Sequence, residues 1–337
     1  MMDFRISSLS EVPALAASLP KADEAARKAA LARQNSLTKP PGSLGRLEEL
    51  AVFMAGWRAT ARPEIALAQA IVFAGNHGIC AQGVNPYPQE VTAQMVANYR
   101  AGGASINQIC AVTGAELDAV ELDLDRPTAD FTQGPAMTEA ETLDAMNRGA
   151  AAVRADADVL ILGEMGIGNS TIASAVAAAL FGGPVAGWVG RGTGSDDAGV
   201  KRKIDAIERG LALHGGKDAM GILAALGGRE QAAICGATLA ARSRGIPVIL
   251  DGFICTSAAA PLFGAAPALL DHCLVGHVSV EPGHRRLLDA MGKEPILNLG
   301  MRLGEGSGAA LALGILRAAL ACHNGMATFG EAGVSDK

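Results

Sequence analysis

Aromatic residues are scarce in this sequence, and long uninterrupted apolar runs are absent from it. Phe, Trp and Tyr together make up 4% of the 337 residues. The longest apolar stretch, residues 173–190, is broken by Gly182, Gly183 and Pro184, so it does not fit a membrane-spanning helix. Residues 1–23 also lack the basic-then-apolar pattern of a secretory signal peptide. We therefore expect a cytoplasmic protein with no membrane partner.

An excess of positive charge is also missing. The formal net charge is −6 at pH 7, whereas a nucleic-acid-binding surface needs a basic face. The single basic cluster, residues 201–203, is too short to provide one, and Lys201 and Arg202 fit a solvated helix face. The composition therefore argues against a nucleic-acid partner.

Patterns that hold metals, disulfides or dinucleotides are missing as well. The six cysteines form no C-x-x-C pair and the six histidines show no metal-binding spacing, so we expect reduced cysteines and no metal site. No G-x-G-x-x-G turn is followed by a ribose-binding acid, and no G-x-x-x-x-G-K-[ST] loop occurs. These absences disfavour an NAD-dependent oxidoreductase and a P-loop kinase, and we expect no cofactor.

What the sequence does contain is an alternation of short apolar runs and helical patterns. The apolar runs predict strands at residues 69–78, 116–123, 157–166, 184–194, 246–253 and 271–280. The helical patterns lie at residues 89–112, 138–155, 170–181, 200–213, 229–244 and 283–291. This alternation predicts a three-layer α/β fold, in which helices cover both faces of a mainly parallel, doubly wound sheet.

Helical patterns also occupy both ends of the chain. Residues 21–62 and 306–322 are rich in Ala and Leu, and we expect them to pack together as a small helical domain. The predicted organisation is N-terminal helices of this small domain in residues 1–65, a large α/β domain with the active site in residues 66–305, and a C-terminal helix in residues 306–337 that joins the small domain.

Three glycine-rich turns, residues 163–171, 190–194 and 304–308, are candidate phosphate sites. Free backbone N–H groups at such entries into helices attract anions. Ligands of open parallel sheets bind at the carboxyl ends of the strands, so we expect one active-site rim there. The adjacent acids Asp196 and Asp197 follow no strand directly. They are predicted to be the N-cap and first-turn acid of a helix, not a magnesium site for a diphosphorylated ribose donor.

Five polar side chains near predicted strand ends are further candidates. Glu164 and Glu305 lie in glycine-rich turns at helix starts, where a glutamate can simply gain from the helix dipole, but their small neighbours leave room for a ligand. His77 ends the first predicted strand and can hold either the loop backbone or a ligand. Ser279 is a candidate phosphate ligand, and His284 fits a surface or capping residue.

These motifs belong to one ordered series along the chain. The series runs K-P-P-G-S-L-G-R-L-E-x-L-A at 39–51, N-H-G-I at 76–79, P-x-x-V-T at 88–92, G-E-M-G-I-G-N-S-T at 163–171, L-D-G-F at 250–253, H-x-S-x-E at 277–281 and M-R-L-G-E-G-S-G-A-A at 301–310. It closely resembles the nicotinate-nucleotide:5,6-dimethylbenzimidazole phosphoribosyltransferases, which make the lower-ligand nucleotide of cobalamin. The resemblance covers about residues 30–325.

The resemblance implies a homodimeric enzyme whose substrates are small molecules. Such an enzyme moves the 5-phosphoribosyl group of nicotinate mononucleotide onto 5,6-dimethylbenzimidazole and gives alpha-ribazole 5′-phosphate and nicotinate. The family's catalytic base matches Glu305, and its second acid matches Glu164. Its phosphoribosyl ligands match Gly166, Gly192, Lys203 and Ser279, and its base pocket matches Ala74, Gln82 and Met165. The family commonly has Asp-His-Gly where this chain has Asn76-His77-Gly78, which removes a charge near the base pocket.

The residues by themselves leave a second class of function open. A non-catalytic nucleotide-binding or regulatory protein on a similar sheet would keep the phosphate loops. It would not need a glutamate such as Glu305 in an open pocket. The position of that carboxylate therefore bears directly on the choice between the two classes.

Overall fold

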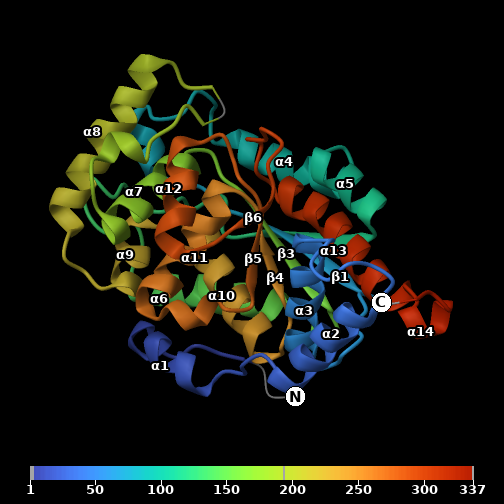
Figure 1. The fold of residues 1–337 in the computed structure, drawn as a ribbon. Coiled ribbons are helices and arrows are strands. Elements are labelled where there is room, and N and C mark those ends of the chain that lie inside the picture. Colours follow the sequence, from blue (N-terminus) through green and yellow to red (C-terminus); the bar gives the residue numbers. More distant parts are fainter. Residues whose placement is uncertain (1–3, 193, 336–337) are drawn as a thin grey trace.

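A six-stranded parallel sheet forms the centre of the molecule in the computed structural model, which describes residues 4–192 and 194–335 (Figure 1). The strands are β1 (Ala68–Ala74), β2 (Ala115–Glu121), β3 (Val159–Met165), β4 (Val248–Leu250), β5 (Cys273–His277) and β6 (Pro295–Leu297). Their order is β2-β1-β3-β4-β5-β6, and every neighbouring pair is parallel. The chain winds outward in both directions from the β1–β3 junction, which confirms the predicted doubly wound fold.

Helices cover both faces of this sheet, as Figure 1 shows. One layer contains α6 (Glu139–Ala152), α7 (Asn169–Phe181), α9 (Ala219–Leu226), α10 (Arg229–Ser243), α11 (Phe253–Ala265) and α12 (Pro282–Met291). The opposite layer contains α3 (Arg46–Arg58), α4 (Glu90–Ala101), α5 (Ser105–Thr113) and α13 (Ser307–Gly325). Further helices are α1 (Val12–Ser18), α2 (Glu24–Ser36), α8 (Asp197–His214) and α14 (Phe329–Ala332).

The strand sequences explain why both faces are covered. Along β1, Ile71 and Phe73 enter the core formed with α6 and α10, whereas Ala70 and Val72 enter the core formed with α3 and α13. Side chains of a strand alternate between its two faces, so a run that is apolar at every position must be buried on both. All seven residues of β1 and of β3 are buried accordingly.

Helices α2 and α3 lie beside the C-terminal helix α13, whereas α1 lies apart from it and contacts α11 (Figure 1). Arg33 of α2 donates hydrogen bonds to three backbone carbonyls near the end of α13, those of His323, Asn324 and Met326. Leu37 forms an antiparallel bridge with Thr328, and α3 packs against α13. These contacts agree with a helical unit built from both ends, although the division at residues 65 and 305 stays a prediction.

One predicted strand does not form, and one strand of the sheet was not predicted. Residues 184–194 form no strand among the residues described. They instead contain the short 3-10 helix η3 (Val185–Gly187), while Thr193 lies outside the described residues. The sixth strand is β6, which no sequence pattern predicted.

The segment 89–112 is two helices, because the chain turns at Gly102, where φ is +80°. None of the described helices has the length and apolar character needed to cross a membrane.

Candidate active site

A cavity of about 690 Å³ opens at the carboxyl ends of β3, β4 and β5. Its walls are the segments that follow these strands, the loop before α13, and residues 84–87 with parts of α4 and α8. This is the edge at which doubly wound sheets bind ligands. The predicted site residues that line it are Glu164, Met165, Gly166, Gly192, Lys203, Ser279 and Glu305.

The backbone at Glu305 adopts a conformation that few side chains tolerate. Gly304, Glu305 and Gly306 have φ angles of 86°, 64° and 85°. A non-glycine residue stays in this region only where its surroundings hold it there. Asp251, directly after β4, provides part of that hold. Its carboxylate accepts hydrogen bonds from the N–H of Gly306 at 3.2 Å and of Ala309 at 2.8 Å, and so caps the start of α13.

Glycine in the neighbouring strand lets this turn approach the sheet. A Cβ on Gly163 of β3 would lie 2.6 Å from the carbonyl carbon and oxygen of Glu305 and 2.7 Å from the nitrogen of Gly306. No real Cβ fits at such distances from backbone atoms. The absence of a side chain at Gly163 therefore sets how deeply Glu305 sits in the cavity.

Glu305 as a whole residue is 8% exposed, and its surroundings act on the pKa of its carboxyl in opposite directions. Burial raises the pKa of Glu305 above that of an ordinary carboxyl, because the charged form loses solvation. The hydroxyl of the buried Tyr99 opposes this rise, since it interacts with the carboxylate, whereas the charge of Asp251 adds to it. The group is thus tuned toward the range in which a carboxylate accepts a proton readily.

Glu164 is the sixth residue of β3 and is 4% exposed. Its carboxylate accepts a hydrogen bond from the side-chain amide of Asn169, at the start of α7. Burial raises the pKa of Glu164 well above the usual carboxyl range, and the charges of Asp251 and other nearby acids raise it further. An opposite charge in the cavity, such as a sugar cation, would favour the ionised form.

The cavity wall around α7 and α8 is suited to an anion. Lys203 of α8 is only 3% exposed, and its ammonium donates to the Ser170 hydroxyl at 3.2 Å and to the Gly190 carbonyl at 3.4 Å. Burial lowers the pKa of Lys203, because its charged form loses solvation. A bound anion would stabilise that charged form. The first turn of α7 also lines the cavity and has no side-chain cap, so its backbone N–H groups can bind an anion.

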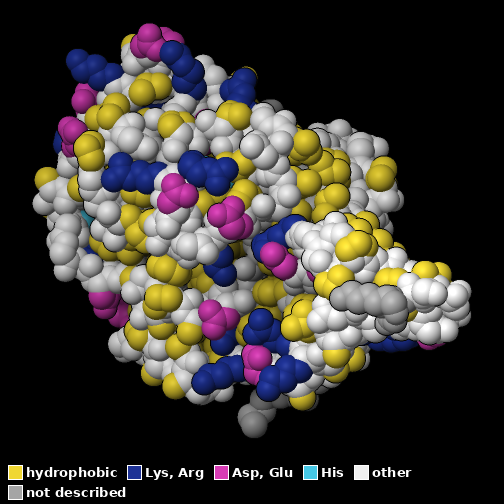
Figure 2. Space-filling view, viewed as in Figure 1, with side chains coloured by type: hydrophobic (Ala, Val, Ile, Leu, Met, Phe, Trp, Pro, Cys, Tyr) yellow, Lys and Arg dark blue, Asp and Glu magenta, His cyan; other side chains and the backbone are white. Residues whose placement is uncertain are grey.

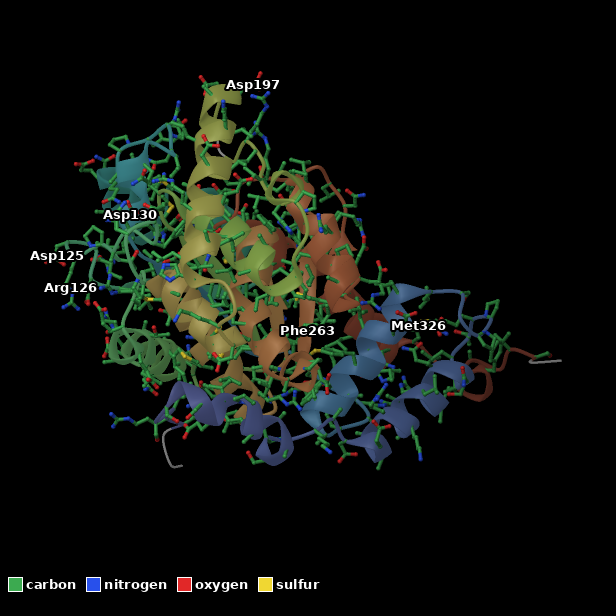
Figure 3. The ribbon with its side chains drawn as sticks, turned by 90° about the vertical axis from the view of Figure 1, so that its left-hand side faces the viewer. Asp125, Arg126, Asp130, Asp197, Phe263 and Met326 are labelled. Carbon is green, nitrogen blue, oxygen red and sulfur yellow. The ribbon has the colours of Figure 1, made fainter. Side chains whose placement is uncertain are left out.

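Two residues of the predicted base pocket do not line this cavity. Ala74 is fully buried at the end of β1, where it pairs in register with Met165 of β3. Gln82 donates to Asp130 at 2.5 Å and accepts from Arg209 of α8 at 2.8 Å. Figure 3 shows Asp130 on the loop next to α8. Met165 alone of these three predicted residues is a wall of the cavity.

The histidines near the strand ends have different environments. His77 is completely buried behind Gly166, with its Nε2 3.2 Å from the Glu230 carboxylate. His277 lines the cavity, with its Nε2 3.6 Å from Asp251. His284 was predicted to be a surface or capping residue; it does not lie on the surface, because it is fully buried, and its Nδ1 accepts the N–H of Ser279 just before α12 at 2.8 Å.

Two further predictions from the sequence can be compared with the geometry. Asp196 is the N-cap of α8 and accepts the N–H of Gly199 at 2.7 Å, as predicted. Asp197 lies at the outer tip of α8 in Figure 3 and pairs with Arg191.

All six cysteines are free thiols. Within residues 4–192 and 194–335, no group of three or more His, Cys, Asp and Glu side chains is arranged to hold a metal ion.

Comparisons with known proteins agree with this geometry. A family model described as phosphoribosyltransferase matches residues 19–334. A nicotinate-nucleotide–dimethylbenzimidazole phosphoribosyltransferase of Rhodobacter capsulatus is 66% identical over 98% of this chain and 99% of its own length. The chain belongs to this phosphoribosyltransferase family. The enzyme of the same name from Mesorhizobium japonicum is 58% identical over 98% of this chain and 99% of its own. The crystal structure of the Thermus thermophilus enzyme of that name matches with a TM-score of 0.87 and 41% identity, over 94% of this chain and all of the other.

In this member of the phosphoribosyltransferase family, three residues around the two glutamates were not predicted from the sequence. Asp251 holds the turn at Glu305, Tyr99 faces its carboxylate, and Asn169 binds Glu164. Asp251 stands in the L-D-G-F motif and Asn169 in the G-E-M-G-I-G-N-S-T motif, so position in a motif could have indicated both. Tyr99 lies in the ordinary helix α4 and carries no such signal.

For this phosphoribosyltransferase, we predict that Gly163→Ala displaces the turn at Glu305. The added Cβ must push the backbone of residues 305–306 away, and a misplacement near 1 Å can cost about a hundredfold in rate. Steady-state kinetics should show a lower kcat, and a binding titration should show a nearly unchanged Kd for the nucleotide. Gly134→Ala is a suitable control, because a Cβ there meets no atom within 4 Å. Equal kcat values for Gly163→Ala and the wild type would contradict the argument.

Proposed function

We propose that this enzyme transfers the 5-phosphoribosyl group of nicotinate mononucleotide to 5,6-dimethylbenzimidazole. The products are alpha-ribazole 5′-phosphate and nicotinate, which belong to assembly of the cobalamin lower ligand. The observation that carries the proposal is that one cavity is lined by the buried Lys203 and by two buried acids, Glu164 and Glu305. A purely nucleotide-binding protein would need the lysine but not the two acids.

The phosphate end of the donor is assigned to the wall made by α7 and α8. The backbone of Gly166 and Gly192, the ammonium of Lys203 and the hydroxyl of Ser279 would hold the 5′-phosphate. All four lie on the same cavity, and the uncapped start of α7 adds the favourable end of its dipole. This assignment places the ribose between the phosphate end and the two glutamates.

Departure of the leaving group needs no acid. The donor carries a pyridinium, and nicotinate leaves it with a neutral ring, so no proton has to be delivered. The anomeric carbon gains oxocarbenium character as this bond breaks. The carboxylate of Glu164 is proposed to stabilise that positive charge, because a charge interaction inside a water-poor cavity is strong.

The acceptor needs a base. Its imidazole attacks the anomeric carbon through the lone-pair nitrogen, and the N–H on the opposite nitrogen becomes much more acidic as the new bond forms. Glu305 is proposed to take that proton. Burial of Glu305 raises its pKa and therefore strengthens it as a base. Met165 is proposed to contact the aromatic ring of the acceptor, and Ala74 and Gln82 to complete the pocket from behind this wall.

The proposed biological setting has four parts. We infer that the enzyme acts in the cytoplasm, as a homodimer, on small molecules only, and without a cofactor. Absence of a nucleic-acid partner is supported by the net charge of −6 and by the face in Figure 2, where Lys and Arg are interspersed with Asp and Glu. Sedimentation at several protein concentrations would test the dimer.

The direct test is to incubate the purified protein with both substrates and follow release of nicotinate. Formation of alpha-ribazole 5′-phosphate in equal amount would establish transfer. A parallel reaction without the benzimidazole separates transfer from simple hydrolysis, because only a hydrolase releases nicotinate there. Tight nucleotide binding with no turnover would favour a regulatory nucleotide-binding protein instead.

The assignment of Lys203 predicts a selective binding defect. Lys203→Ala should raise the KM for nicotinate mononucleotide about tenfold or more, since a hydrogen bond to a charged group contributes about 1.5–3 kcal/mol. The KM for the aromatic base should stay close to that of the wild type. Lys201→Ala is the matched control, because Lys201 is an exposed lysine on the same helix. An unchanged nucleotide KM in Lys203→Ala would remove Lys203 from the phosphate site.

A further inference from the structure

A third acid, Glu281, lies in the part of the cavity assigned to the phosphate. It ends the H-x-S-x-E motif and precedes α12. Its Oε1 accepts the backbone N–H of Gly192 at 3.0 Å. Gly192 is one of the groups proposed to bind the 5′-phosphate. The side chain of Glu281 therefore uses a donor that the substrate needs.

The turn at residues 190–192 is shaped around this carboxylate. A Cβ on Gly190 would lie 1.9 Å from Oε2 of Glu281, and a Cβ on Gly192 would lie 3.2 Å from the ammonium of Lys203. Glycine at position 190 leaves the space that the carboxylate occupies, and glycine at position 192 leaves room beside the ammonium of Lys203. Arg302 donates to the Gly192 carbonyl at 3.1 Å and helps to hold the turn in place.

The charges around Glu281 are those of an anion site. Burial raises the pKa of Glu281, whereas Lys203, the N–H of Gly192 and Arg302 oppose this rise because they favour the ionised form. Reciprocally, Glu281 is the acid that supports the charge of the buried Lys203. The Glu281 carboxyl thus lies among the groups that would favour the negative charge of a bound phosphate.

We propose that Glu281 is an internal anion that occupies the phosphate subsite of the free enzyme and lowers its affinity for phosphate. The inference rests on the proposed function, because it takes Gly192 and Lys203 as the phosphate ligands. A phosphate that binds there either displaces the carboxylate from Gly192 or binds beside it against electrostatic repulsion between the two negative groups. Both outcomes weaken binding of the nucleotide donor and of the nucleotide product, so Glu281 assists product release.

The test is calorimetric titration of inorganic phosphate and of nicotinate mononucleotide into wild type and Glu281→Gln. Glutamine keeps the size of the side chain and an oxygen that can accept from Gly192, but removes the charge. Removal of one charge a few ångströms away should tighten both ligands roughly tenfold. Nicotinate, which has no phosphate, should bind both proteins alike. Glu294→Gln is the control, because Glu294 is exposed and precedes β6, at the opposite end of that strand from the cavity.

A second variant reaches the same point by another route. The Cβ of Gly190→Ala would meet Oε2 of Glu281 and push the carboxylate out of its place, so it should also tighten phosphate binding. Unchanged or weaker phosphate binding in both variants would overturn the proposal. Failure of the proposed function has a different signature: the wild type would release no nicotinate in the presence of benzimidazole, whatever Glu281→Gln does to phosphate affinity.

Discussion

Glu305→Gln is expected to lower kcat by about two to four orders of magnitude, which is the usual effect of losing a general base. Nucleotide binding should change little, because the phosphate end of the cavity is formed by other residues. Glutamine keeps the size and polarity of the side chain. The variant therefore removes the ability to take a proton while it preserves the turn at residues 304–306.

The pH profile gives this prediction a second measurement. Burial raises the pKa of Glu305, and a base must be ionised to act. The wild-type kcat/KM should therefore fall as pH decreases through a pKa above the ordinary carboxyl value of about 4.3. Glu305→Gln should lose this part of the profile. Glu294→Gln, with the same change at an exposed site, should retain both rate and profile; near wild-type turnover in Glu305→Gln would remove Glu305 as the base.

The sheet was predictable where burial and strand pairing coincide. The strands β1 and β3 are apolar at nearly every position and are buried on both faces, and their sequences predicted them. In the segment 184–194, Val185, Trp188 and Val189 are also apolar and buried, but they belong to no strand. Trp188 is fully buried, stacks against the Arg286 guanidinium at 4.4 Å and donates to the Gly182 carbonyl. Hydropathy reports burial and does not distinguish these two ways of achieving it.

The strand β6 was missed for the opposite reason. It has three residues, begins with Pro295, and all three are only partly buried. A short strand at the edge of a sheet needs neither a long apolar run nor strong strand propensity. The pairing of Leu297 with His277 supplies the signal, and that contact exists only in the folded chain.

The site residues divide in the same way, into those that a local sequence pattern marks and those whose function depends on contacts in the folded chain. Glu164 and Glu305 were identifiable because glycines surround each of them in the sequence. The L-D-G-F motif marks Asp251, but its function could not be predicted from the sequence, since Asp251 accepts two N–H groups from a helix that begins more than fifty residues later. A contact between distant segments leaves no local pattern. For Gln82, the resemblance to the family predicts a base-pocket residue, which stays a prediction; its side chain bonds to Asp130 and Arg209.

Glu164→Gln is expected to reduce kcat by about two to three orders of magnitude, the size of effect seen when one preorganised electrostatic group is lost. The reason is that a neutral amide cannot offset the positive charge at the anomeric carbon. Glu164→Gln should have little effect on binding and deprotonation of the aromatic base, because deprotonation of the acceptor is assigned to Glu305. Single-turnover kinetics with nicotinate mononucleotide would measure the bond-breaking step directly.

Stability measurements on the same variant test whether Glu164 carries a charge in the folded enzyme. Burial raises the folded-state pKa of Glu164 above its unfolded value, so the folded state holds its proton more tightly. This group therefore stabilises the wild type at low pH, and that contribution is lost as pH rises through the window above the unfolded pKa. The free energy of unfolding of Glu164→Gln should improve relative to the wild type across the same window, by up to about 1.4 kcal/mol per pH unit. A pH-independent difference would contradict the raised pKa, because it would show that Glu164 ionises as readily in the folded enzyme as in the unfolded chain.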